Sequence, residues 1–185
     1  MREIASKGQL RLAFLRWAVV TVPFILLLGM TSARLVPSGA ENAWYRALIK
    51  PDQMPPEWAF PVAWTAIYVM MGLALAMVIN ARGSPLRGPA ITVFAVQMGL
   101  NLLWSPVFFG MHQVMTALII IAALLVLVLV TIVLFGRIRV GAGVLLIPYL
   151  AWLGYAGFLL YQIDRLNPNA ESLVPSRSVD QIQIR

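Results

Sequence analysis

The sequence predicts an all-α membrane protein built as a bundle of five transmembrane helices. The chain is 61% hydrophobic and only 11% charged, with a mean hydropathy of +0.83, far more apolar than a typical soluble domain. Several apolar runs also approach the ~20 residues that span a hydrocarbon core. Its 185 residues suffice for one domain. We expect a basic extension over residues 1–16, the membrane domain over residues 17–167 and a polar tail over residues 168–185.

Composition also excludes several classes of function. The chain contains no cysteine and one histidine, His112, so disulfides, a bis-histidine haem site and a multi-histidine metal cluster are not expected. The net charge of +7 could suggest nucleic acid, but the basic residues sit singly or in pairs between apolar runs. We therefore interpret them as membrane-flanking charges.

The first apolar run extends from Trp17 to about Ala33. Its basic start, short apolar core and small residues at 31–33 also fit a secretory signal. A retained first transmembrane helix fits better, because residues 12–15 can extend the run by a turn. Within this run Gly29 and Ala33 have the small-xxx-small spacing of a helix-packing pair.

Four further spans are expected at residues 58–80, 90–109, 114–135 and 140–162. The long connection over residues 36–57 contains prolines that predict an ordered loop, with a short helix around residues 42–49. Trp44 and Tyr45 in this loop suit either interface anchors or a lid over a pocket. The polar tail from Asp164 onward is expected to be mobile.

The third span carries a polar stripe. Three of its side chains recur at i, i+4 and i+8, and on a helix they point the same way: Gln97, Asn101 and Ser105. Trp104 lies beside them. Pro106 cannot donate to the carbonyl of Leu102, so we expect the helix to bend there.

The interiors of spans two to five contain no ionisable side chain. Ion-coupled carriers usually need such groups at the midplane, and no hydrolytic triad or carboxylate pair is present. An aromatic set remains: Trp64, Tyr68, Trp104, Tyr149 and Trp152. A single tryptophan would most often be a headgroup anchor, but here three helices each place a ring beside a proline or an amide. A cavity lined by these rings, with Gln97 and Asn101 as polar contacts, suits a large flat apolar ligand with a few polar edges.

Four motifs, in order and at the right spacing, resemble the TspO/translocator-protein family, the tryptophan-rich sensory proteins. Residues 55–68, PPEWAFPVAWTAIY, resemble the start of that family's second helix, and residues 97–110 resemble its third-helix signature. Residues 148–152, PYLAW, running to the RLN of residues 165–167, resemble its fifth helix. Trp44-Tyr45 with Lys50-Pro51 resembles its first loop.

The resemblance implies a membrane protein, often a homodimer, that binds porphyrins such as protoporphyrin IX and haem, with no obligatory cofactor and no metal site of its own. The positions matching ligand-contacting residues, beneath the first loop, are Tyr45, Trp64, Asn101, Trp104, Trp152 and Ala156. A tetrapyrrole-binding sensory or regulatory protein is therefore our leading interpretation. Trp64 and Trp152 match two tryptophans linked in bacterial relatives to light-dependent porphyrin breakdown, so a porphyrin-degrading enzyme with these two as catalytic residues is an alternative.

Two positions depart from the family pattern. Gln53 replaces a loop tryptophan, and Leu160 replaces a pocket asparagine, so the ligand can differ. Residues 159–165, with Leu159, Tyr161 and Arg165, also fit a proposed cholesterol motif. A sterol- or lipid-binding carrier is thus a second alternative, although such residues at a helix end commonly serve only as interface anchors.

Charge distribution predicts the orientation. With five spans the termini lie on opposite sides, and the N-terminal side has eight Lys and Arg residues against six on the other side. The eight are Arg2, Lys7, Arg11, Arg16, Arg82, Arg87, Arg137 and Arg139; the six are Arg34, Arg46, Lys50, Arg165, Arg177 and Arg185. The positive-inside rule then places the N-terminus in the cytoplasm.

Overall fold

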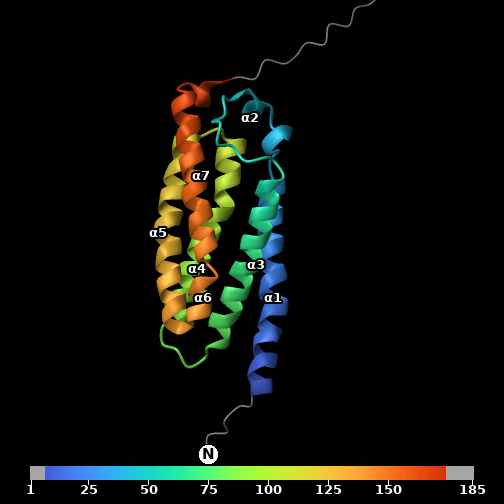
Figure 1. Cartoon of the computed structure of the whole chain (residues 1–185), viewed down its shortest axis with the longest axis vertical. Helices are drawn as coiled ribbons and strands as arrows, with labels where there is room; N and C mark the ends of the chain where they lie inside the picture. Colours follow the sequence, from blue (N-terminus) through green and yellow to red (C-terminus); the bar gives the residue numbers. More distant parts are fainter. Residues whose placement is uncertain (1–6, 174–185) are drawn as a thin grey trace, which may run out of the picture.

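The computed structural model describes residues 7–173, and in that part of the chain every regular element is helical. Five segments are long and apolar enough to cross a membrane. They correspond to α1 (Lys7–Arg34), of which the span begins at Arg11, α3 (Ala59–Asn80), α4 (Arg87–Ser105), α5 (Val114–Ile138), and α6 (Val140–Val144) together with α7 (Ile147–Leu166) (Figure 1). The predicted five-helix class is confirmed.

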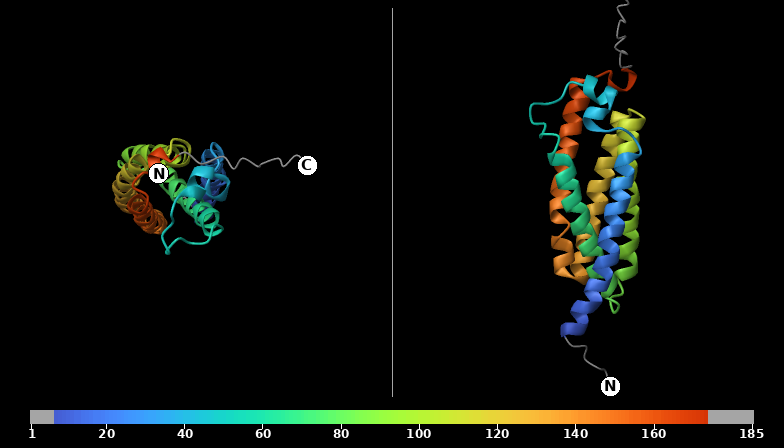
Figure 2. Two further views of the ribbon diagram at one scale, coloured as in Figure 1. Left: turned by 90° about the horizontal axis from the view of Figure 1, so that it is seen from above. Right: turned by 90° about the vertical axis from the view of Figure 1, so that its right-hand side faces the viewer.

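The helices form a ring when seen end-on (Figure 2). α1 packs along α3, and α5 packs against both α4 and α7. α3 and α7, in contrast, share little close backbone contact. The space between these two helices therefore depends on the side chains that occupy it.

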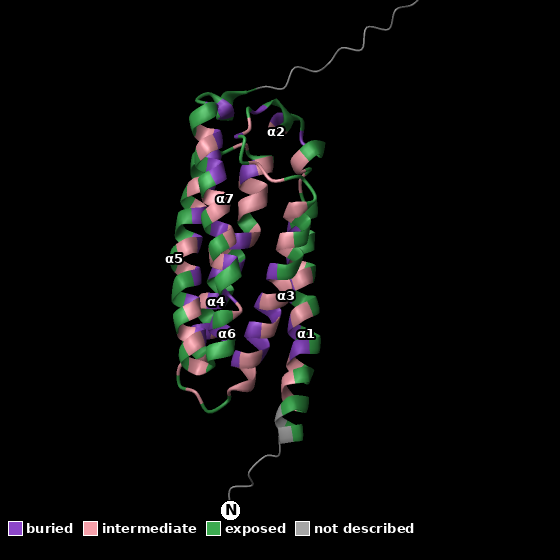
Figure 3. Ribbon diagram, in the orientation of Figure 1, coloured by how far each residue is buried: buried purple, intermediate pink, exposed green. Residues whose placement is uncertain are grey.

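Buried and exposed residues alternate along the helices (Figure 3). The main core joins residues from all the spans, among them Ile25, Met71, Phe94, Leu124 and Leu153. Large apolar side chains such as Val19, Leu27 and Val126 are exposed on the outside. An apolar exterior of this kind is what contact with lipid requires.

Glycines bring α1 and α3 together. A Cβ placed on Gly72 would lie 2.6 Å from Cα of Val22, so a larger residue would push the two backbones apart. The hydroxyl of Thr21 donates to the Gly72 carbonyl over 2.7 Å. Gly29 similarly makes room for the ring of Tyr68, whereas Ala33 is exposed. The predicted small-residue pair is thus right for Gly29 and wrong for Ala33.

The first helix begins earlier than predicted. It starts at Lys7, so part of the expected basic extension is helical. Residues 7–16 contain three Leu and two Arg residues, which have high helix propensity. Hydropathy alone marks only the part of a helix that is apolar, and therefore misses this first part.

The third span changes helix type at its proline. α4 ends at Ser105, and residues Pro106–Gly110 form a π-helical turn, η2. Pro106 removes the N–H that would bond to Leu102 in an α-helix. The Leu102 carbonyl instead accepts a hydrogen bond from the Ser32 hydroxyl of α1, at 2.6 Å. A bend was predicted here, and the structure shows a change from α-helix to π-helix at the proline.

The fifth span is not the single helix that hydropathy predicts. It breaks between α6 and α7, because Pro148, in the first turn of α7, cannot bond to Val144 and would clash with its carbonyl. Before the break, the chain reverses at Arg139, and α6 packs on α5. A Cβ on Gly143 would lie only 2.9 Å from Cα of Gly136.

The long connection contains η1 (Gly39–Glu41) and α2 (Ala43–Ala47), which confirms the predicted short helix. The Asn42 side chain accepts from the backbone N–H of Tyr45 at 2.9 Å, and its amide donates to the carbonyls of Pro37 and Phe109, both at 2.9 Å. One buried asparagine therefore caps α2 and ties the connection to the end of η2.

The start of the tail is anchored. Asn167 accepts from the N–H of Ile49 at 2.8 Å and donates to its carbonyl at 2.9 Å, and η3 (Ala170–Ser172) follows. The predicted mobility is therefore wrong for residues 164–173, because an asparagine that satisfies a loop backbone is fixed by it. The rest of the tail lies outside the described residues.

Candidate functional site

A network of hydrogen bonds joins three helices in the middle of the bundle. The Asn101 amide of α4 donates to the Tyr149 hydroxyl of α7 over 2.9 Å, and the Tyr68 hydroxyl of α3 donates to the Asn101 carbonyl oxygen over 3.1 Å. Tyr149 in turn donates to the Gln97 side chain over 3.2 Å. Gln97 and Asn101 are only 1% and 7% exposed, so the network satisfies amides that lipid could not. Ser105, the third residue of the predicted stripe, takes no part in it.

Aromatic rings fill the space between α3 and α7. The ring of Trp64 lies 5.5 Å from that of Tyr68 and 6.1 Å from that of Tyr149, centroid to centroid. Trp152 of α7 contacts Phe60 of α3 at 5.8 Å. The tryptophans of the two helices thus face a shared interior, and Asn101 lies at its polar side.

A second group of rings lies beneath the connection. Trp104 stacks on Phe108 at 5.1 Å, and Tyr45 contacts Phe109 at 5.3 Å. Ala156 packs against the same buried group. Lys50 places its Nζ 4.7 Å from the centroid of the Tyr45 ring, a cation–π geometry.

The six predicted ligand residues thus divide into two groups. Trp64, Asn101 and Trp152 belong to the space between α3 and α7. Trp104 and Ala156 lie beneath the connection, and Tyr45 belongs to the connection itself. Asn101 and Trp104 are three residues apart on α4, which makes the groups neighbours. Two surface cavities lie at other places, one at the turns at the N-terminal end and one beside η3, and neither is lined by these six residues.

Two indole N–H groups in the site lack an acceptor. The Nε1 atoms of Trp104 and Trp152 are buried and have no hydrogen-bond partner in residues 7–173. A buried donor that stays unpaired costs about 1–3 kcal/mol. Such donors are rare in folded proteins and call for an explanation. Here both belong to the predicted ligand set, so the arrangement can offer two hydrogen bonds to a bound molecule.

The connection is fastened to α7 by Gln53. Its carbonyl accepts from the Tyr155 hydroxyl over 2.7 Å, and its side chain accepts from Gln162 over 3.3 Å. The sequence identified Gln53 only as a departure from the family. Its role depends on two α7 residues that are far away in the chain, and no local signal predicted it.

Leu160 is buried, at 3% exposed, within the apolar group that contains Trp44 and Phe108. An amide there would face hydrocarbon, so leucine suits this surrounding. Leu159 is also buried, whereas Tyr161 is exposed. The residues of the proposed sterol motif therefore do not share one outward face.

Trp44 is a structural anchor. It is 1% exposed, and its Nε1 donates to the carbonyl of Ala170 over 2.8 Å. His112, in the left-handed region with φ 58°, stacks on it with ring centroids 4.5 Å apart. The turn after η2 directs this half-buried ring onto the indole.

The fold and the site together define an integral multi-pass membrane protein whose five spans enclose a cluster of rings and amides. The model of the TspO/MBR family matches residues 19–166. The chain belongs to this family.

Three relatives illustrate the match. The chain is 37% identical to a tryptophan-rich protein TspO of Chlorobaculum tepidum, over 77% of this chain and 90% of that protein. It is 41% identical to a tryptophan-rich sensory protein of Cereibacter sphaeroides, over 69% and 79%. The translocator protein of Homo sapiens is 32% identical over 67% of this chain and 75% of its own length.

Proposed function

We propose that this protein is a membrane sensor or regulator that binds a tetrapyrrole, protoporphyrin IX or haem, between α3, α4 and α7 beneath the connection. The observation that carries the proposal is the pair of unpaired indole N–H groups of Trp104 and Trp152, set among stacked rings. The sensory role is supported by the name of the Cereibacter sphaeroides relative.

A tetrapyrrole matches this surrounding in two ways. Its flat apolar ring can stack on tryptophan faces, and its two propionates are hydrogen-bond acceptors that the indole N–H groups lack. A hydrogen bond from an N–H group to a charged carboxylate is stronger than one to a neutral acceptor. The rings now touch one another, so the ligand enters by separating rings of α3 from rings of α7, where the two backbones are least tightly joined.

Titration of the purified protein with protoporphyrin IX and with haem tests this function. If the site recognises the flat ring, both ligands bind with similar affinity and His112→Ala changes neither, because His112 stacks on Trp44 and on none of the six proposed ligand residues. Binding of haem alone, lost in His112→Ala, would contradict the proposal and make this a metal-ligating haem protein.

Illumination separates a sensor from a porphyrin-degrading enzyme. A sensor leaves the porphyrin absorption bands unchanged under light. Loss of the bands with a new product, abolished in Trp152→Phe and in Trp64→Phe, would instead assign the two tryptophans to catalysis. Flux of porphyrin or sterol across proteoliposomes would identify a carrier.

The orientation and the assembly are also proposals. We propose a cytoplasmic N-terminus, supported by the excess of Lys and Arg on that side, and a homodimer, as the family resemblance implies. Protease accessibility of the two ends in sealed vesicles tests the first, and mass measurement in detergent tests the second. Membrane lipid is the expected surrounding, and nucleic acid is not an expected partner.

A further inference from the structure

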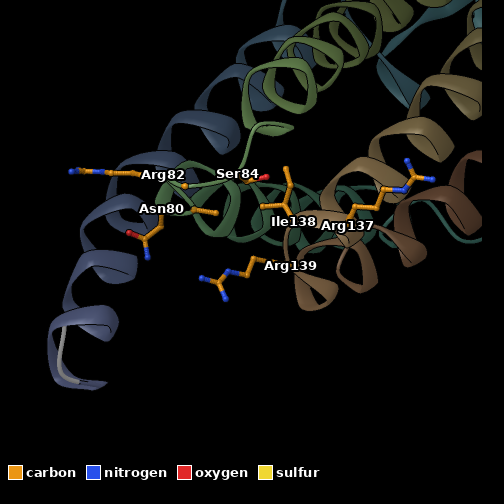
Figure 4. Close-up of a pocket in the computed structure, with 8 residues that line it drawn as sticks. Asn80, Arg82, Ser84, Arg137, Ile138 and Arg139 are labelled. Atoms are coloured by element: carbon orange, nitrogen blue, oxygen red, sulfur yellow. The ribbon is translucent and has the colours of Figure 1, made fainter. Parts of the chain in front are cut away.

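A cavity of about 490 Å³ lies at the end of the bundle where α1 begins, far from the aromatic site. It is formed by the turn between α3 and α4 and by the reversal between α5 and α6 (Figure 4). Its lining includes three arginines and two neutral polar residues: Arg82, Arg137, Arg139, Asn80 and Ser84. A basic cavity of this kind favours an anionic ligand.

No acidic side chain of the described residues, 7–173, neutralises the positive charge of this cavity. None of its three arginines forms an ion pair within residues 7–173, and no acidic residue occurs between Glu57 and Asp164. The acidic residues of the described chain all lie at the opposite end: Glu41, Asp52, Glu57, Asp164 and Glu171. The arginine end therefore attracts anions over the range of a Debye length, about 8 Å at physiological salt.

The backbone around the cavity is tightly packed, whereas the arginine side chains extend away from it. The close approach of Gly143 to Gly136 fixes the reversal that carries Arg137 and Arg139. Figure 4 shows Arg139 extending toward Asn80, with Arg82 and Arg137 extending to opposite sides. The Asn80 amide and the Ser84 hydroxyl have no hydrogen-bond partner in the described part of the chain. They are thus free to join an anion held by the guanidinium groups.

The surroundings of the cavity favour a lipid over a soluble anion. The cavity lies where the membrane-spanning helices α3 and α5 end, which is the level of lipid headgroups. Directly after Arg139, Val140 is 76% exposed, and Val144 and Val133 are 55% and 46% exposed. A ligand with a phosphate and an apolar chain matches both parts of this surface.

We propose that this cavity binds the headgroup phosphate of an anionic phospholipid from the leaflet on the N-terminal side. The positive charge of the three guanidinium groups attracts the phosphate, and the acyl chains follow the exposed valines of α5 and α6. This lipid site is separate from the tetrapyrrole site and does not depend on the proposed function.

Native mass spectrometry of the full-length protein, titrated with phosphatidylglycerol or phosphatidylethanolamine, tests the proposal. We expect the wild type to retain phosphatidylglycerol at least about tenfold better, since one basic residue near an anionic surface contributes about fivefold. The triple variant Arg82→Gln, Arg137→Gln, Arg139→Gln should lose this preference. The single variant Arg139→Lys, which keeps the charge, should keep most of it.

The matched control removes arginines at the other end. A variant with Arg34→Gln, Arg46→Gln and Arg165→Gln loses the same charge and should retain phosphatidylglycerol like the wild type. Equal loss in both triple variants, or no loss in either, would overturn the proposal. Competition by millimolar inorganic phosphate would also overturn it in favour of a soluble anion, whereas failure of phosphate to compete supports the lipid. Circular dichroism confirms that each variant is folded.

Discussion

At the scale of single residues, the hydrogen bonds of Asn101 join its own helix, α4, to two other helices of the aromatic site. It donates to Tyr149 of α7 and accepts from Tyr68 of α3. Asn101→Leu removes both bonds and should lower the free energy of unfolding by about 1 kcal/mol, at about 0.6 kcal/mol for each interhelical bond. Denaturation in detergent measures this.

Ser105→Ala is the matched control for Asn101→Leu, because Ser105 lies one turn further along the same stripe without a bond in the network. It should leave stability unchanged. If Asn101→Leu weakened porphyrin binding at unchanged stability, Asn101 would be a ligand contact rather than a tie between helices.

The buried indole N–H groups differ in whether they already donate a hydrogen bond within the protein. Trp104→Phe and Trp152→Phe each remove an unpaired donor, so each should weaken protoporphyrin IX binding by about tenfold without loss of stability, as expected for one hydrogen bond to a charged group. Trp44→Phe removes a donor that bonds to Ala170, and it should lower stability while leaving the affinity unchanged. The absorbance of bound porphyrin and thermal unfolding report the two effects. Reversed effects would contradict the assignment.

Helical spacing sufficed to predict that Gln97 and Asn101 converge, because both lie on regular α-helix. It placed Ser105 on the same face, but that residue ends α4, and the π-helical turn begins directly after it. The partners Tyr68 and Tyr149 could not be paired with the amides from sequence. Which face of α3 and α7 turns inward depends on packing, which the apolar pattern of a membrane helix does not record.

At the scale of elements, the bond from Ser32 to the Leu102 carbonyl replaces the one that Pro106 removes from α4. Ser32→Ala leaves this carbonyl unpaired and should lower stability by about 1 kcal/mol. In a Pro106→Ala background the helix can supply its own donor, so the same change should have a smaller effect. A double-mutant cycle measures the coupling. Additive effects would mean that Ser32 does not substitute for the missing N–H.

The contact between α1 and α3 depends on the size of one residue. Gly72→Ala places a methyl 2.6 Å from Cα of Val22, so the helices must separate, with a loss of about 1–3 kcal/mol, typical of overpacking. Gly99→Ala is the control, because nothing lies within 4 Å of its added Cβ. It should be neutral or slightly stabilising, since alanine is the better helix former. Equal effects in unfolding measurements would show that the contact is not tight.

Two prolines within membrane spans, Pro106 and Pro148, change the helix that contains them, but only the effect of Pro106 was predicted from sequence. Pro106, beside Ser105 and the stripe, was predicted to distort its helix, and it does. Pro148 lies within a run that is apolar on both sides, and a broken span has the same hydropathy as a continuous one. The break between α6 and α7 was therefore missed, although the proline itself is the physical reason for it.

At the scale of the whole molecule, five spans were predictable because hydrocarbon admits only segments that satisfy their own backbone bonds. The anchoring of the connection was not. Asn167 bonds to Ile49, and Trp44 bonds to Ala170, and these partners lie more than a hundred residues apart in sequence. Such bonds between distant residues leave no local pattern.

The division of the ring into α1 with α3 on one side and α4, α5 and α7 on the other makes the protein a natural two-part assembly. One turn, residues 81–86, connects the two parts covalently. Hydrogen bonds such as those of Tyr68 with Asn101 and of Ser32 with the Leu102 carbonyl connect them without a covalent link. Separate polypeptides covering residues 1–83 and 84–185 should therefore assemble when made together. A tag on one piece should then purify both, with porphyrin binding restored, and Asn101→Leu combined with Ser32→Ala should lower the recovery. Failure of the unaltered pieces to associate would mean that the turn itself holds the halves in place.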